Sequence, residues 1–132
     1  MISCRSMRFK IDTKAHYRVF TLEEPALDAN MAAELLQMLN NDAHARATSL
    51  ILDLSGVKVL DASGMGAILT VYDTIYANNA SCAIASLNTE CCRALLKHSG
   101  HLDLNLVRTV SEGVDLVMME YLERSLSGGE EI

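Results

Sequence analysis

The chain has 132 residues, a length that fits a single domain. Half of its residues are hydrophobic, 21% are charged and only 5% are aromatic, which excludes a disordered chain and predicts an aliphatic core. The formal net charge of −6 is opposite in sign to that of a general nucleic-acid binder, so no nucleic-acid partner is expected.

The sequence also predicts where the protein resides. No apolar run reaches the roughly 18 residues that span a bilayer, so membrane insertion is not expected. The opening residues, MISCRSMRFK, lack the apolar stretch of a secretory signal. The four cysteines have neither Cys-x-x-Cys nor disulfide-like spacing, which predicts reduced thiols in the cytoplasm: Cys4, Cys82, Cys91 and Cys92. Nothing in the sequence requires a cofactor.

The N-terminal third predicts a strand hairpin followed by a helix. Apolar and polar side chains alternate along residues 7–11 and 16–22, so two strands joined by a turn at 12–14 are expected to pair. A helix then begins after Asp28 or Asn30, either of which can cap it. Its apolar residues recur at helical spacing: Met31, Leu35, Met38 and Leu39.

From Ser49 onward, predicted strands and helices alternate. The apolar run SLILDL at 49–54 is typical of a strand buried on both faces, and an extended stretch follows at 57–60. The later elements are an amphipathic helix at 65–76, a strand at 82–87, a helix from 89, a strand at 104–107 and a helix from 111. The order ββαβαβαβα predicts a single-domain α/β fold with a mixed sheet and about four helices.

The ends of the chain differ in charge and composition. A flexible N-terminus is expected at 1–6, one domain at 7–122 and an acidic flexible tail at 123–132. Residues 1–20 hold five of the eleven Lys and Arg residues, whereas residues 112–132 hold six acids and one Arg. This asymmetry predicts a solvated basic edge and an acidic helix face.

The segment VLDASGMGAIL, residues 59–69, carries the most information about function. Its strand leads to Asp61-Ala62-Ser63, two glycines and a helix, so Ser63 lies at the N-terminus of that helix. Unpaired backbone N–H groups there favour an anion, and a phosphate on Ser63 would be tolerated. Gly64 and Gly66 are expected to leave the surface around Ser63 open to another protein. Ordinary N-capping explains the same spacing and is the alternative.

This segment resembles the signature of STAS domains, specifically those of bacterial anti-sigma factor antagonists. Their pattern is a buried strand ending in hydrophobic-Asp-Ser-Ser-Gly-hydrophobic-Gly, followed by an apolar helix. Ser63 matches the phosphorylated serine, whereas Ala62 replaces the serine often found before it. The resemblance extends over about residues 7–122. The family's Gly-Glu-Leu-Asp turn corresponds to residues 23–28, where Asp28 matches the aspartate and the glycine is absent.

The resemblance implies a binding protein rather than an enzyme. Such an antagonist binds an anti-sigma factor that is also a serine kinase, is released when the kinase phosphorylates the serine, and is restored by a serine phosphatase. The resemblance assigns phosphorylation to Ser63. It assigns partner contacts to a larger set: Asp28, Asp61, Ala62, Ser63, Gly64, Met65 and Gly66.

The sequence allows three other interpretations. The chain could be a STAS module of a lipid-transport or signalling assembly in which Ser63 is never phosphorylated, and weak nucleotide binding, known in some STAS domains, stays open. A serine hydrolase is disfavoured because a nucleophile elbow needs glycines where Asp61 and Met65 stand. A zinc site is disfavoured by the spacing of its candidate ligands: Cys91, Cys92, His98 and His101.

Overall fold

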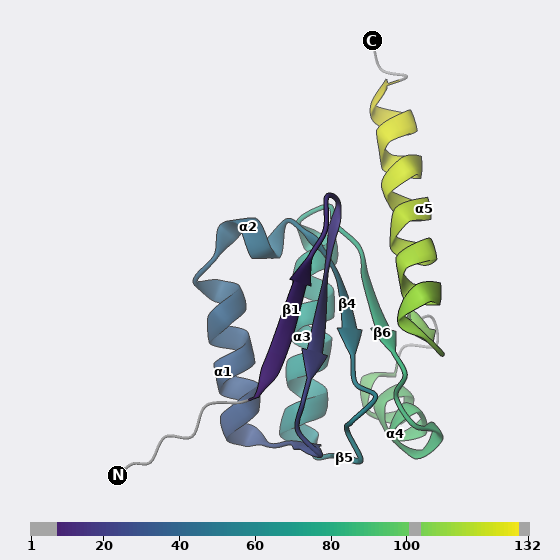
Figure 1. Cartoon of the computed structure of the whole chain (residues 1–132). Coiled ribbons are helices and arrows are strands. Elements are labelled where there is room, and N and C mark those ends of the chain that lie inside the picture. Colours follow the sequence, from purple (N-terminus) through teal and green to yellow (C-terminus); the bar gives the residue numbers. More distant parts are fainter. Residues whose placement is uncertain (1–7, 101–103, 130–132) are drawn as a thin grey trace.

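A five-stranded mixed sheet runs through the centre of the molecule (Figure 1). The structure, a computed structural model, describes residues 8–100 and 104–129. The strand order is β1-β2-β4-β6-β7; β1 is antiparallel to β2, and the other neighbours are parallel. The strands are β1 (Phe9–Thr13), β2 (Tyr17–Leu22), β4 (Ser49–Asp53), β6 (Cys82–Ala85) and β7 (Leu106–Val107). The predicted hairpin and mixed α/β sheet are confirmed.

Helices cover both faces of this sheet. One face packs against α1 (Ala29–Asn40), α3 (Ala62–Ala77) and α4 (Thr89–Ser99), which contribute Leu35, Ile75 and Leu95 to the larger apolar core. The opposite face carries α5 (Val110–Gly129), whose Val117 packs with Ile51 and Ala83. The strands β4 and β6 are therefore buried on both sides, as their apolar sequences predict.

Three short elements complete the fold, and two of them were not predicted. They are β3 (Ala26–Leu27), β5 (Val59–Leu60) and α2 (Ala43–Arg46). The predicted extended stretch at 57–60 contains β5, which pairs with β3 in a separate two-stranded sheet. A two-residue strand has no periodicity of its own, so β3 follows from tertiary pairing. The polar residues that end α1 include Asp42, which caps α2 by accepting a hydrogen bond from the His44 N–H.

The C-terminal helix is longer than predicted. The tail was expected to begin at residue 123, but α5 continues through Gly129. Two contacts hold its later turns: the Tyr121 ring stacks on His16 at 4.5 Å, and Arg124 donates to Ser81 Oγ at 2.8 Å. The helix therefore continues past residue 122, where the flexible tail was expected to start. The expected flexible N-terminus at 1–6 lies outside the described residues.

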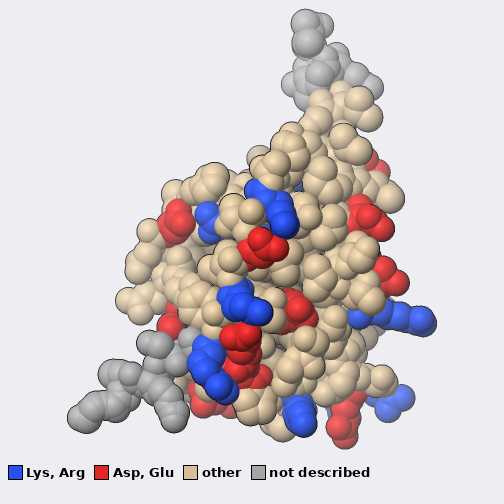
Figure 2. Space-filling model, viewed as in Figure 1, with Lys and Arg blue, Asp and Glu red and all other residues tan. Residues whose placement is uncertain are grey.

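Charged side chains of both signs follow the exposed edge strand β1 (Figure 2). The basic residues of this region do not form a uniform patch, because three of them lie within 3.4–3.6 Å of carboxylates: Arg8 with Glu24, Lys10 with Glu23 and Lys14 with Asp12. Such exposed pairs contribute little stability. A charged edge does, however, discourage β-pairing with another chain.

Candidate functional site

Two helix N-termini meet where the short sheet ends. The strands β3 and β5 run parallel, with Ala26 opposite Val59 and Leu27 opposite Leu60. The next residue on each strand is an aspartate that caps a helix. Asp28 accepts a hydrogen bond from the Met31 N–H at 3.0 Å and caps α1, and Asp61 accepts one from the Gly64 N–H at 2.8 Å and caps α3. The pairing therefore brings together Asp28 and Asp61, which are distant in the chain.

Ser63 lies in the first turn of α3, with its side chain exposed. The first backbone N–H groups of a helix have no partner within the helix, and the helix dipole places positive partial charge there. Asp61 satisfies one of these groups, so an additional anion on Ser63 would interact both with the positive helix end and with the Asp61 carboxylate. The structure thus places Ser63 at the N-terminus of the helix, as predicted.

The two glycines after Ser63 have different roles. Gly64 is buried, and a Cβ built there would overlap the carbonyl oxygen of Leu27 and lie 3.2 Å from the Leu27 Cβ. Gly64 thus allows α3 to approach β3 closely, which fixes the distance between the two halves of the site. A Cβ on Gly66 would meet nothing within 4 Å. The expectation of an open surface therefore suits Gly66 and not Gly64, which is buried against Leu27.

Apolar side chains lie around the exposed serine. Val59 is 59% exposed, and Leu60 and Met65 are half-buried. Together with Asp28, Asp61, Ala62 and Ser63, these three form what we call the Ser63 surface. The exposure of Val59 could not be predicted from the sequence, because a β-branched residue in a short strand carries no signal that separates an exposed position from a buried one.

The loop that leads into this surface is fixed at both sides. The Lys58 N–H donates to the Pro25 carbonyl at 2.7 Å. The side-chain amide of Asn88, the N-cap of α4, donates to the Val57 carbonyl at 3.4 Å, and the Cys91 thiol in the first turn of α4 donates to the Lys58 carbonyl at 3.5 Å. The Ser63 surface is therefore presented by a loop anchored to its neighbours.

The structure gives no support to the hydrolase or zinc interpretations. In the described part of the chain, no histidine forms a hydrogen bond with Ser63: His16 stacks on α5, His44 lies in α2 and His98 is near the end of α4. No group of three potential metal ligands occurs among residues 8–100 and 104–129, and His101 lies outside them. Burial, with a smaller effect of the neighbouring Cys91, raises the pKa of the Cys92 thiol.

Comparison with known families agrees with this geometry. The family model described as STAS domain matches residues 8–116. The chain belongs to the STAS domain family. A comparison with curated proteins finds no match. Within the described residues, no helix combines the length and apolar character that crossing a bilayer requires.

Several solved STAS structures share the fold. The anti-sigma factor antagonist SpoIIAA in its unphosphorylated form is 20% identical, with 84% of this chain and 96% of that chain covered and a TM-score of 0.63. A serine-to-glutamate variant of RsbS from Moorella thermoacetica is 19% identical, with 89% and 98% covered and a TM-score of 0.67. The murine anion transporter Slc26a9 is 17% identical, with 82% of this chain matched and a TM-score of 0.62. The chain spans only 18% of that transporter's length.

Proposed function

We propose that the protein is an anti-sigma factor antagonist that acts by partner switching. The unphosphorylated Ser63 surface binds an anti-sigma factor with serine kinase activity, phosphorylation of Ser63 releases that partner, and a serine phosphatase restores binding. The protein itself is a cytoplasmic binding module without catalytic activity of its own. The observation that carries this proposal is the exposed Ser63 in the first turn of α3, with the exposed Val59 on the preceding strand.

The physical basis of the switch is the cost of burying charge. A phosphate adds about −1.5 to −2 charge at pH 7. A partner that covers Val59 and Met65 would have to remove water from that phosphate, which is unfavourable unless new hydrogen bonds replace it. Asp61 adds a negative charge at the same helix end. Loss of about 1.4 kcal/mol of binding free energy already weakens affinity tenfold.

Mass spectrometry after incubation with the candidate kinase and ATP tests the proposal. We expect one added phosphate on the wild-type protein and none on Ser63→Ala. Ser55→Ala is the matched control, because Ser55 is an exposed serine in the loop before β5 and should leave phosphorylation unchanged. A kinase that binds the protein but modifies Ser63→Ala as well as the wild type contradicts the assignment.

Binding of the kinase provides a second test. Ser63→Asp should weaken binding at least tenfold in calorimetry, because the charge is introduced on the Ser63 surface. Its circular dichroism should match that of the wild type, since acidic residues are favourable in the first turn of a helix. An unchanged affinity would show that charge at position 63 does not control release.

A second candidate function is a STAS module in a lipid-transport or signalling assembly, without phosphorylation of Ser63. It is favoured by an exposed apolar stripe on α5, where Met119, Leu122 and Leu126 are 61%, 55% and 67% exposed. Their spacing places them on one side of the helix, and exposed apolar patches commonly mark interaction sites. Leu122→Lys should disrupt such an assembly but leave kinase binding at the Ser63 surface unchanged.

A further inference from the structure

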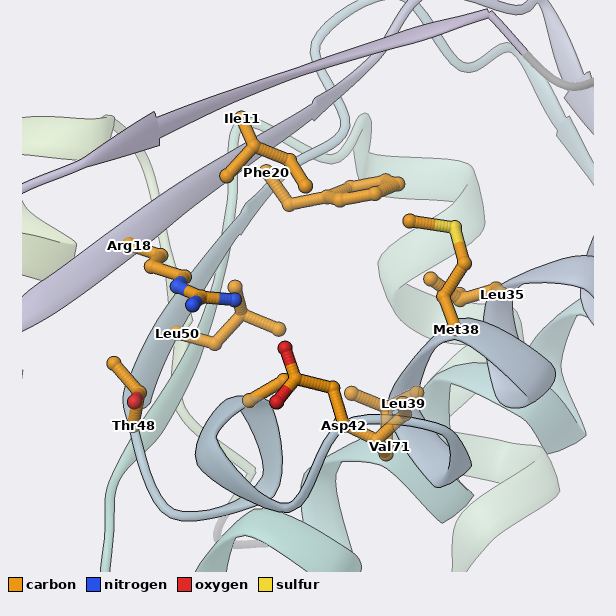
Figure 3. A pocket seen from close by; sticks show the side chains of 11 residues that line it. Ile11, Arg18, Phe20, Leu35, Met38, Leu39, Asp42, Thr48, Leu50 and Val71 are labelled. Atoms are coloured by element: carbon orange, nitrogen blue, oxygen red, sulfur yellow. The ribbon is translucent and has the colours of Figure 1, made fainter.

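A cavity of about 150 Å³ lies between the sheet and the first two helices, away from the Ser63 surface (Figure 3). Its walls come from β1, β2, β4, α1 and α2, with Val71 of α3 at its base, and most of its lining is apolar: Phe20, Leu35, Met38, Leu39 and Leu50 are among the contributors. An engineered protein cavity of about 150 Å³ with a similar aliphatic and aromatic lining binds benzene. The size therefore suits a single small ring or a short aliphatic chain.

The cavity has one polar end. The Arg18 guanidinium and the Asp42 carboxylate line it from opposite sides and point toward each other in Figure 3. Arg18 Nε is buried and has no hydrogen-bond partner within the described residues. Buried N–H groups are nearly always paired in native proteins, so an unpaired donor in a cavity wall indicates a site for an acceptor.

The charges at this end restrict the ligand. Arg18 and Asp42 form no ion pair in the described part of the chain, and they place opposite charges at the same end of the cavity, where Asp42 is exposed. An anionic head group would be attracted by the guanidinium but repelled by the carboxylate. A hydroxyl can accept a hydrogen bond from the guanidinium, whose N–H groups include the unpaired Nε–H, and can donate one to a carboxylate oxygen, so it can pair with both residues without adding charge.

We infer that this cavity binds a small neutral molecule with a benzene-sized apolar body and a hydroxyl head group placed between Arg18 and Asp42. This binding function is independent of Ser63 phosphorylation. The apolar body contacts Phe20, Leu35 and Leu50, and its burial supplies most of the affinity. The hydroxyl contributes selectivity, because analogues without it leave Arg18 Nε unpaired.

Benzyl alcohol is the probe, and its binding is followed by amide chemical shifts in NMR and by the unfolding temperature. We expect saturable shifts confined to the cavity walls and an unfolding temperature that rises with probe concentration. Arg18→Met keeps an apolar stem and removes the donor. It should therefore lower the affinity for benzyl alcohol at least tenfold, while the affinity for toluene should change little. Toluene should bind the wild type more weakly than benzyl alcohol, and benzoate more weakly still.

A second variant blocks the cavity without touching its polar end. Ala45→Leu adds apolar volume from α2, so it should abolish binding of both benzyl alcohol and toluene in a folded protein. Absence of saturable shifts for both probes in the wild type would overturn the site. Equal affinity of Arg18→Met and wild type for benzyl alcohol would overturn the role of Arg18, and tighter binding of benzoate would overturn the neutral head group.

Discussion

Replacing Gly64 by alanine tests the contact that holds the two halves of the Ser63 surface together. The new Cβ would overlap the Leu27 carbonyl oxygen and would lie 3.2 Å from both the Cβ and Cγ of Leu27. Because the main obstacle is backbone, relief requires α3 and β3 to move apart. Overpacking of this kind costs about 1–3 kcal/mol. The higher helix propensity of alanine offsets about 0.8–1 kcal/mol of that cost.

Gly66→Ala is the matched control in the same helix. Its Cβ would meet nothing within 4 Å, so only the propensity gain of about 0.8–1 kcal/mol should remain. Gly64→Ala should therefore be less stable than the wild type, and Gly66→Ala more stable. The two variants should differ by about 1–3 kcal/mol, the overpacking cost itself.

Urea unfolding measures this difference through the midpoints, provided that the denaturant dependence is the same for all three proteins. Kinase binding provides a second readout, because separation of α3 from β3 would also displace Asp28 relative to Ser63. A Gly64→Ala variant as stable as Gly66→Ala would refute the close contact between Gly64 and Leu27. Both proteins should remain folded, since domains of this kind have a total stability of about 5–15 kcal/mol.

Three further predictions concern hydrogen bonds. Asp61→Ala should destabilise the fold by about 0.5–2 kcal/mol in urea unfolding, because the cap of α3 is lost. Asp61→Asn should retain most of the stability, because asparagine also caps helices. Ser49→Ala should cost about 1–3 kcal/mol, because Ser49 Oγ accepts from the buried Ser81 N–H at 3.0 Å. Tyr76→Phe should reduce the loss of stability that sets in as the pH rises above about 10. Burial, and secondly the hydrogen bond to Glu120, raises the Tyr76 pKa above its ordinary value of 10.0, so its contribution is complete below that pH and is lost above it.

Each of these has a contrary outcome. Equal losses for Asp61→Ala and Asp61→Asn would show that the charge of Asp61 matters more than the cap. Ser125→Ala is a control for Ser49→Ala, because Ser125 is exposed on α5 and its truncation should change stability by less than about 0.5 kcal/mol. Parallel stability curves for Tyr76→Phe and wild type at alkaline pH would mean that Tyr76 does not titrate differently in the folded state.

Local patterns were sufficient to predict much of the fold and part of the site. The alternation in β2, the apolar run of β4 and a polar cap before α1 depend on neighbouring residues, so the sequence shows them directly. The sequence does not single out Asp61 as the cap of α3, because the apolar spacing places the start of that helix at Met65 rather than at Ala62. The pairing of β3 with β5 could not be derived, since two-residue strands are defined by their partner. The burial of Gly64 and the cavity beside Arg18 also depend on contacts between distant segments, which no periodicity encodes.

The parallel pairing of Leu27 with Leu60 makes the Ser63 surface a property of the folded chain. Ser63 and Met65 belong to one continuous segment, but Asp28 joins them only after the long-range contact has formed. A kinase that docks on both helix ends would therefore modify native molecules and ignore unfolded ones. Damaged or nascent copies would then neither sequester the kinase nor consume ATP, so the size of the phosphorylated pool would report the amount of correctly folded protein.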